Sequence, residues 1–207
     1  MKIMLIIPSL GFGGAETLVL NWLRYWLCAP DIREIVLVLY TERFLERLGE
    51  LRQHPKLRLE IEASNTPWRM FRPRYFVHLW RLRRIIVKHA PDIIHSNLVA
   101  DIDLALLYPF LPRNIRIVHT AHCPVEHENK GHYRRLLKRF YARRRVDLVA
   151  VSGVVRDSIA SCYHRPAHLI LNGALRPPRT ERFDEVKVEI DRLATAEDGS
   201  KKYVFVG

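Results

Sequence analysis

The sequence predicts a doubly wound α/β fold built on a mostly parallel sheet. Short apolar runs rich in β-branched residues recur along the chain, segments with apolar residues at helical spacing separate them, and a glycine-rich turn follows the first run. A strand, a glycine turn and a helix form the usual opening of such a domain. A chain of 207 residues can bury roughly 70% of its unfolded surface without disulfide support.

The predicted strands are short and apolar. Pro8 closes the first strand, and the third is the weakest because charged residues interrupt it. Strands are expected at residues 2–7, 34–40, 57–61, 92–95, 115–119, 147–151 and 168–171.

The predicted helices follow these strands and carry apolar residues three and four positions apart. The second ends before Pro91 and the third stops at Pro112, since proline cannot continue a helix. Helices are expected at residues 17–27, 74–89, 101–110, 133–145 and 153–161.

The composition changes after Gly173. Residues 176–182 contain two prolines and four charges, which is typical of a linker, and residues 184–194 have helical spacing. Residues 203–207 begin a new apolar strand that ends at a glycine. We therefore expect a first domain over 1–173, a linker and helix over 174–202, and at 203–207 the first strand of a truncated second domain.

Charge and cysteine content narrow the class of protein. The chain holds 34 Lys and Arg against 22 Asp and Glu, a net charge of +12, which indicates an anionic partner or an excess spread over a solvated surface. No apolar run approaches the ~20 residues of a membrane span, and the first is too short for a signal peptide. The three cysteines are widely spaced, which favours a reducing, cytoplasmic setting.

The first candidate site is the turn from Gly11 to Glu16. Gly13 and Gly14 let a ligand approach the backbone, and the following helix start offers unpaired N–H groups to a phosphate or a sugar hydroxyl. Glu16 stands where a dinucleotide fingerprint needs glycine, and it can instead accept hydroxyls or cap the helix. A tight turn without a ligand is the alternative.

Histidines at strand ends are the second candidate. His95 ends the fourth predicted strand, and His119 and His122 lie at and just beyond the end of the fifth. Ligands of open parallel sheets bind outside the carboxyl ends of the strands, where a histidine can bond a hydroxyl or move a proton. We expect His119 to be a buried, satisfied histidine, and His122 is a candidate for bonding a hydroxyl or moving a proton.

Metal and nucleophile sites are not favoured. His122, Glu126 and His127 lack the helical spacing of a zinc motif, and Pro124 interrupts the segment. Ser152 precedes a glycine but lacks the G-x-S-x-G context. We expect no metal and no cofactor.

Two basic, aromatic-rich stretches, residues 68–88 and 130–145, are the third feature. Such stretches suit an interfacial helix on anionic lipid, but also an ordinary helix packed on the sheet with a charged outer face. Nucleic acid is a third option, although no RNA-binding or helix-turn-helix signature supports it. The membrane-contact candidates are Trp80, Arg84, Arg135, Lys138 and Arg139.

The ordered series of motifs resembles the N-terminal domain of glycosyltransferase family 4. The motifs are Ile3–Ile7, Gly13-Gly14-Ala15-Glu16, Pro91-Asp92-Ile93-Ile94-His95, Val118-His119-Thr120-Ala121-His122, Asp147–Ser152 and Leu171-Asn172-Gly173.

The resemblance implies one Rossmann-like half of a two-domain GT-B enzyme that transfers a sugar with retention. It places Gly13 and Gly14 beside the donor diphosphate and the acceptor, and His122 on the transferred sugar. The other cleft positions that it implies are Ser152, Asn172 and Gly173. Glu16 in the glycine turn and His95 at a strand end remain substrate-binding candidates from the residues alone.

The resemblance also implies the partners. They are a nucleotide-sugar donor, which is a co-substrate, and a lipid-linked or saccharide acceptor at the inner face of the cytoplasmic membrane. The sequence departs from the family pattern at Asn97, where a second histidine is common, and at Leu171, where proline is common. The donor-binding residues of the family's C-terminal domain are missing, so we expect residues 1–207 alone to be inactive.

Two other functions remain open. One is a non-catalytic acceptor-domain or membrane-binding module that needs a partner donor domain. The other is a basic nucleic-acid-binding protein, which salt-dependent binding to nucleic acid would support.

Overall fold

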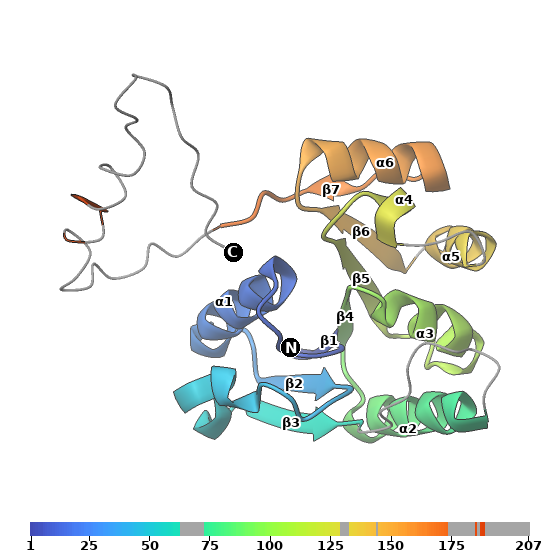
Figure 1. Ribbon diagram of the computed structural model, residues 1–207. Coiled ribbons are helices and arrows are strands. Elements are labelled where there is room, and N and C mark those ends of the chain that lie inside the picture. The colour runs from blue at the N-terminus through green and yellow to red at the C-terminus, as the bar shows by residue number, and fades with distance from the viewer. Residues whose placement is uncertain (63–72, 129–132, 144, 174–184, 186, 189–207) are drawn as a thin grey trace, which may run out of the picture. The chain divides into compact units, whose positions relative to one another are not determined.

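The computed structural model describes residues 1–62, 73–128, 133–143, 145–173, 185, 187 and 188 (Figure 1). The chain divides into two compact units, Met1–Ala174 and Leu175–Gly207. All elements named below belong to the first unit. The predicted linker, most of the predicted helix at 184–194 and the predicted strand at 203–207 lie outside the described residues.

A seven-stranded sheet with the order β3-β2-β1-β4-β5-β6-β7 forms the centre of the first unit. Every neighbouring pair of strands is parallel, which confirms the predicted fold class. The strands are β1 (Lys2–Ile7), β2 (Glu34–Leu39), β3 (Leu57–Ile61), β4 (Ile93–Asn97), β5 (Arg116–Ala121), β6 (Val146–Ala150) and β7 (His168–Leu169).

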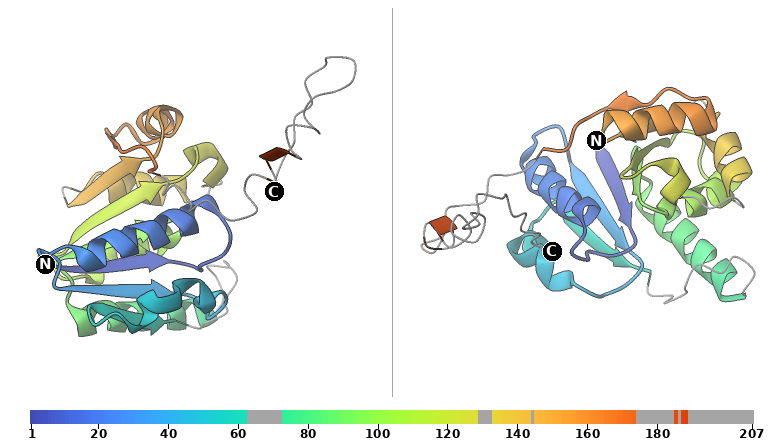
Figure 2. Two further views of the ribbon diagram at one scale, coloured as in Figure 1. Left: turned by 90° about the vertical axis from the view of Figure 1, so that its left-hand side faces the viewer. Right: turned by 45° about the horizontal axis from the view of Figure 1, so that its top comes forward.

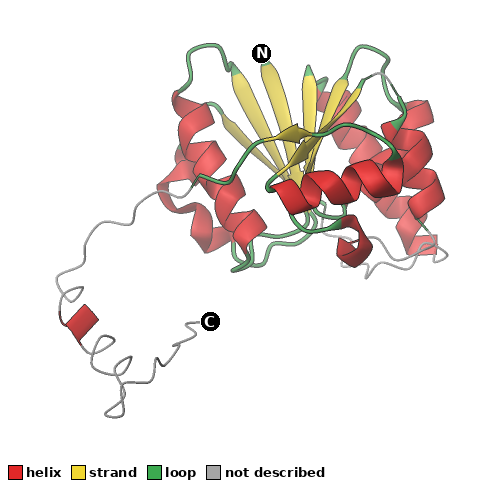
Figure 3. Ribbon diagram, turned by 90° about the horizontal axis from the view of Figure 1, so that it is seen from above, coloured by secondary structure: helices red, strands yellow, loops and turns green. Residues whose placement is uncertain are grey.

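Helices cover both faces of this sheet (Figures 2 and 3). The α-helices are α1 (Gly14–Cys28), α2 (Pro73–His89), α3 (Ala100–Leu107), α4 (Val125–Glu128), α5 (Arg134–Tyr141) and α6 (Gly153–Tyr163). Two 3₁₀ segments are η1 (Leu45–Gln53) and η2 (Tyr108–Phe110).

The alternation of side chains along β1 creates two cores. Leu5 and Ile7 pack in the core under α1 and η1. Met4 and Ile6 belong to the larger core under α2, α3, α5 and α6. All four residues are fully buried, as expected for a central strand of a parallel sheet.

The elements differ from the predicted ones mainly at their ends. β4 runs to Asn97 and β5 to Ala121, two residues farther than predicted, because the ladder continues by pairing Asn97 with Thr120. The helix predicted to reach residue 145 ends at Tyr141. There the Arg143 N–H bonds to the Phe140 carbonyl, and the Arg145 carbonyl accepts from the Ile117 N–H at the start of the ladder. Neither η1 nor α4 was predicted.

Candidate functional site

All strands are parallel, so their carboxyl ends lie along one edge of the sheet, which we call the carboxyl edge. The turn before α1 follows β1, His122 directly follows β5, and Ser152 lies just after β6. The fold therefore brings residues from three predicted motifs to one edge, although they are far apart in the sequence.

The glycine turn ends at Gly13, and α1 begins at Gly14, three residues earlier than predicted. No side chain caps this helix start. The Thr17 N–H and hydroxyl both bond to the Gly13 carbonyl, at 3.1 and 3.0 Å. The Glu16 carboxylate folds back over the turn, and a Cβ atom added at Gly13 would clash with its Oε2. Gly13 therefore leaves room for an acidic group at the start of α1.

Arg47 of η1 holds this turn from the other side, and sequence reasoning missed it. Its guanidinium donates to the carbonyl oxygens of Leu10, at 2.9 Å, and Gly11. It also donates to Thr17 Oγ1 at 3.2 Å and lies 5.0 Å from the Phe12 ring centroid. No sequence signal marks Arg47, because η1 has no clear helical pattern.

His122 is held by Asn97, the residue at the end of β4. The Asn97 amide nitrogen donates to the Ile6 carbonyl at 3.4 Å, which turns its Oδ1 toward His122 Nε2 at 3.0 Å. Nε2 therefore carries the proton. Burial, together with the nearby His119, lowers the pKa of His122 to about 4. His122 is thus a neutral, oriented imidazole at neutral pH.

His95 lies inside β4 rather than at its end, and it faces α1. Its Nε2 is 2.8 Å from Thr120 Oγ1 on the neighbouring strand. The Trp22 ring stacks on the imidazole with a centroid distance of 4.9 Å, and Trp26 lies 5.6 Å away. Burial, followed by repulsion from His119 and His122, lowers the pKa of His95 to about 3. His95 is therefore also neutral.

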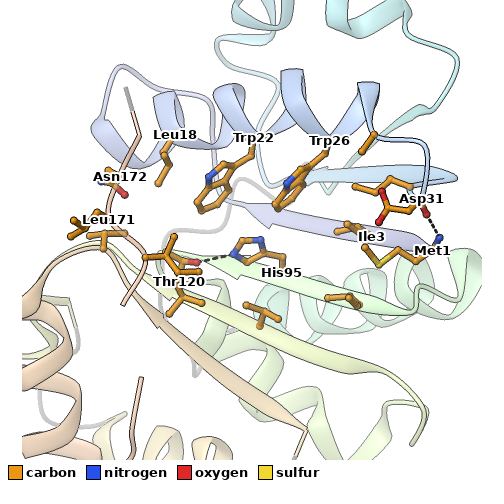
Figure 4. A pocket seen from close by; sticks show the side chains of 17 residues that line it. Met1, Ile3, Leu18, Trp22, Trp26, Asp31, His95, Thr120, Leu171 and Asn172 are labelled. Carbon is orange, nitrogen blue, oxygen red and sulfur yellow. Dashed lines mark hydrogen bonds between the residues drawn. The ribbon is translucent and has the colours of Figure 1, made fainter. Parts of the chain in front are cut away.

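A largely apolar groove of about 560 Å³ lies over this part of the sheet. Trp22 and Trp26 of α1 form one side, and residues of β4, β5 and β6, including His95 and Thr120, form the other (Figure 4). Asn172, just after β7, lines the end of the groove. The groove thus joins two predicted site residues, His95 and Asn172.

His119 faces the opposite core. It is 2% exposed, its Nδ1 lies 3.1 Å from Ser96 Oγ, and its ring stacks on Tyr141. The prediction of a buried, satisfied histidine is confirmed. Asp101, whose Oδ2 accepts from the Tyr141 hydroxyl, is also buried. Burial outweighs that hydrogen bond and raises the pKa of Asp101 to about 7.

A second buried polar cluster lies under α2 near the carboxyl edge. Asp103 accepts from the hydroxyls of Tyr40, at 2.8 Å, and Tyr75, at 2.5 Å. The His78 ring lies between Glu62 Oε2 and Asp103 Oδ2, the latter at 3.2 Å. Burial alone would lower the pKa of His78, but the hydrogen bonds to Asp103 and Glu62 outweigh it and raise that pKa to about 9. Sequence reasoning did not connect these residues.

The remaining predicted residues have simpler surroundings. Ser152 is the N-cap of α6, and its hydroxyl accepts from the Val155 N–H at 3.3 Å. Asn172 and Gly173 are exposed. The membrane-contact candidates on α2 and α5 are all exposed; they are Trp80, Arg84, Arg135, Lys138 and Arg139.

Two negative findings concern only the described residues. Within them, no group of three or more His, Cys, Asp or Glu side chains is arranged to hold a metal ion. None of the helices that the structure describes has the length and apolar character needed to cross a bilayer.

Comparisons with solved structures show where this fold recurs. HepE from Anabaena, in complex with UDP, superposes with a TM-score of 0.66 at 14% identity, covering 94% of this chain and 51% of that one. A glycosyltransferase from Rickettsia africae gives a TM-score of 0.62 at 15% identity, covering 92% and 49%. The lipopolysaccharide outer core galactosyltransferase WaaB gives 0.61 at 17% identity, covering 83% and 45%.

The chain spans about half the length of these structures. At such identities the likeness establishes the fold, which is the Rossmann-like architecture found in GT-B glycosyltransferases. No curated protein matched the sequence significantly. The model of Glycosyltransferase Family 4 matches residues 12–174, from the glycine turn to just beyond β7, and the chain therefore belongs to this family.

Proposed function

We propose that the chain supplies the acceptor-side half of a retaining glycosyltransferase. In this reaction a sugar moves from a nucleotide-sugar donor to a hydroxyl of a lipid-linked or polysaccharide acceptor, and a nucleoside diphosphate leaves. The observation that carries the proposal is the neutral His122, oriented by Asn97 at the carboxyl edge of the sheet that also presents the start of α1.

The chemistry needs two features that these residues can provide. Negative charge grows on the departing diphosphate, and the uncapped N-terminus of α1 at Gly13 and Gly14 offers N–H groups and a positive dipole end to it. The sugar must be held while its C1 becomes oxocarbenium-like. A neutral imidazole can hydrogen-bond sugar hydroxyls without adding a competing positive charge, and this is the role we assign to His122.

The other site residues receive supporting roles. The carboxylate of Glu16, beside the turn, would accept hydrogen bonds from hydroxyls of the acceptor substrate. Asn172 and Gly173 would border the cleft, and His95 would shape it through Thr120 and Trp22 rather than touch the reacting atoms. Ser152 would fix the start of α6. No metal or other cofactor is assigned, and the site of action is the inner face of the cytoplasmic membrane.

Acceptor binding can be tested on the 207-residue chain. We would titrate octyl glucoside and octyl galactoside, below their micelle concentrations, into the chain and follow saturation-transfer NMR. We expect binding that His122→Ala weakens about three- to tenfold, because one hydrogen bond is worth about 0.5–1.5 kcal/mol. His54→Gln, at the opposite edge of the sheet, is the matched control and should bind normally.

Turnover is measured separately with UDP-glucose and UDP-galactose as donors and the same glycosides as acceptors. We expect no transfer by residues 1–207 alone. Sugar transfer by this chain alone would refute the proposal that it needs a separate donor-binding domain. Equal glycoside binding by the wild type and His122→Ala would remove His122 from the site. Complete absence of glycoside binding would favour the alternative, a non-catalytic module.

A further inference from the structure

Helix α2 has two apolar sides, and only one of them faces the protein. The buried side consists of Tyr75, His78, Leu82 and Ile86, spaced three and four residues apart. The opposite side exposes Phe76, Val77, Trp80 and Val87, with exposed fractions of 66, 46, 54 and 47%. A helix that only packs on a sheet normally carries polar residues on its outer side.

The exposed apolar residues form one stripe. Residues 76, 80 and 87 are separated by four and seven positions, which places them in line along a helix with 3.6 residues per turn. Val77 lies beside this line on the helix surface, on the side of α2 that faces away from Leu82. The stripe therefore runs along the pole of α2 that is farthest from the core.

Positive charges surround this stripe. Arg84 lies within it, with its guanidinium 4.7 Å from the Trp80 ring centroid. Arg83 lies on one flank, and Arg81 and Lys88 lie on the other. No acidic residue occurs anywhere in α2. Two glutamates, Glu60 in β3 and Glu62 just after it, offset part of the charge, since Lys88 bonds to Glu60 at 2.6 Å and Arg81 lies 3.8 Å from Glu62.

Helix α5, the other basic helix of this protein, can be compared with α2. The sequence made both basic stretches equal candidates for membrane contact, but the structure separates them. The apolar residues Leu137, Phe140 and Tyr141 of α5 are all buried, so its outer side presents Arg135, Lys138 and Arg139 without an aromatic residue. Helix α5 can attract anionic surfaces electrostatically, whereas α2 can also insert side chains.

We propose that the outer side of α2 docks on an anionic lipid bilayer. Phe76, Trp80 and Val87 would enter the interface between headgroups and acyl chains, and the flanking cations would bind lipid phosphates. The pattern of an aromatic stripe between arginines and lysines complements such a surface in both polarity and charge. Nucleic acid would gain from the cations but not from the two exposed valines.

The position of α2 relates this surface to the site. The helix follows β3, so it begins near the carboxyl edge, and its end lies near the start of β1, where Lys2 Nζ bonds to the His89 carbonyl at 3.0 Å. One end of the docking surface thus lies near the edge that holds His122. This inference rests on the proposed function, because it names the acceptor class for that reaction. A chain docked on lipid favours a lipid-linked acceptor over a soluble polysaccharide.

Vesicle binding of the 207-residue chain tests the proposal. Sedimentation with sucrose-loaded vesicles of phosphatidylcholine and phosphatidylglycerol in equal parts should capture the chain, and vesicles of phosphatidylcholine alone should capture much less. The double variant Phe76→Ser/Trp80→Ser should weaken capture at least tenfold. Neutralising Arg83 and Arg84 to Gln should weaken it about fivefold per charge, and added salt should weaken the wild type.

Two variants serve as controls. Tyr25→Ser removes an exposed aromatic residue from α1, 66% exposed, and should leave capture unchanged. The triple variant Arg135→Gln/Lys138→Gln/Arg139→Gln should reduce capture through charge alone and leave the tryptophan blue shift of bound protein intact. Thermal unfolding by circular dichroism establishes that each variant is folded, as expected for changes at exposed positions.

Three outcomes would overturn the proposal. They are wild-type binding that does not depend on phosphatidylglycerol, capture of Phe76→Ser/Trp80→Ser equal to that of the wild type, and salt-sensitive binding to an oligonucleotide without binding to vesicles. The test is independent of sugar chemistry. If the chain binds octyl glycosides but not vesicles, the proposed function stands and this inference fails. If it binds vesicles but not octyl glycosides, this inference stands and the proposed function fails.

Discussion

The charge of His78 provides the sharpest test of the energetics. Its ring lies between Glu62 and Asp103 and is almost fully buried. The folded-state pKa of about 9 exceeds the value of 6.5 that is normal for histidine. The folded protein therefore holds one more proton than the unfolded chain between these two pH values. The stabilisation is complete below pH 6.5 and is lost as the pH rises through 9.

The magnitude follows from the linkage of protonation and folding. While the folded state holds one extra proton, the free energy of unfolding falls by about 1.4 kcal/mol for each unit by which the pH rises. Over the window from pH 6.5 to 9, His78 thus accounts for about 3 kcal/mol. This is a large share of the ~5–15 kcal/mol of a typical domain.

Urea unfolding at pH 6, 7.5 and 9 is the assay. We expect the wild type to lose stability steadily across this range, and His78→Gln to lack this part of the slope. The variant should also be less stable at pH 6, by about 3–5 kcal/mol, because two buried carboxylates lose the cation between them. His54→Gln should follow the wild type, because the control histidine lies in a loop away from the cluster.

Identical pH slopes for the wild type and His78→Gln would refute this reasoning. If the variant does not fold, the imidazole signals of the wild-type protein supply the same test by NMR titration. A His78 resonance that titrates near pH 6.5 rather than near 9 would show that the two carboxylates do not hold the ring in its charged form.

Three further predictions concern packing and hydrogen bonds, each measured as a change in urea midpoint. Ser152→Ala should cost about 0.5–2 kcal/mol, since it removes the N-cap of α6, while Ser161→Ala, an exposed position near the other end of α6, should cost less; equal costs would exclude the cap. Leu82→Ala should cost about 2–5 kcal/mol because the side chain is fully buried, and a cost below 1 kcal/mol would mean that the core collapses around it. Tyr141→Phe should cost about 1–3 kcal/mol by removing the hydroxyl bonded to Asp101, and more at pH 8 than at pH 5.5, because an ionised Asp101 needs that donor; a cost independent of pH would contradict the pairing.

The fold could be predicted because its signals are local. Strands β1 and β2 are almost entirely apolar on both faces, and a proline or glycine marks many of the boundaries. Residues 57–61 were predicted with the bounds of β3, even though charges interrupt them. The ends of β4 and β5 were predicted too short, since pairing between strands, rather than local sequence, extends both to polar residues such as Asn97 and Thr120.

The site could be predicted only in part. A histidine after a strand of a parallel sheet is a recognisable signal, so His122 was predicted to belong to the site, and the structure places it directly after β5. Its partner Asn97 and the turn-binding Arg47 were not assigned roles, because their contacts depend on elements distant in sequence. The pairing of His78 with Glu62 and Asp103 joins a strand end to two helices, and no spacing in one dimension predicts it.

The tryptophans of α1 give the groove an optical consequence. Trp22 and Trp26 are stacked at 5.6 Å and only partly buried, and both line the groove. Indole emission moves to shorter wavelength when a ring loses contact with water, so anything that fills the groove would change the intrinsic fluorescence without a label. Trp80, on the outer side of α2, would report membrane contact by the same effect. The sequence has a fourth tryptophan, Trp68, which lies outside the described residues. A Trp68→Phe/Trp80→Phe variant therefore leaves only the two groove tryptophans to emit.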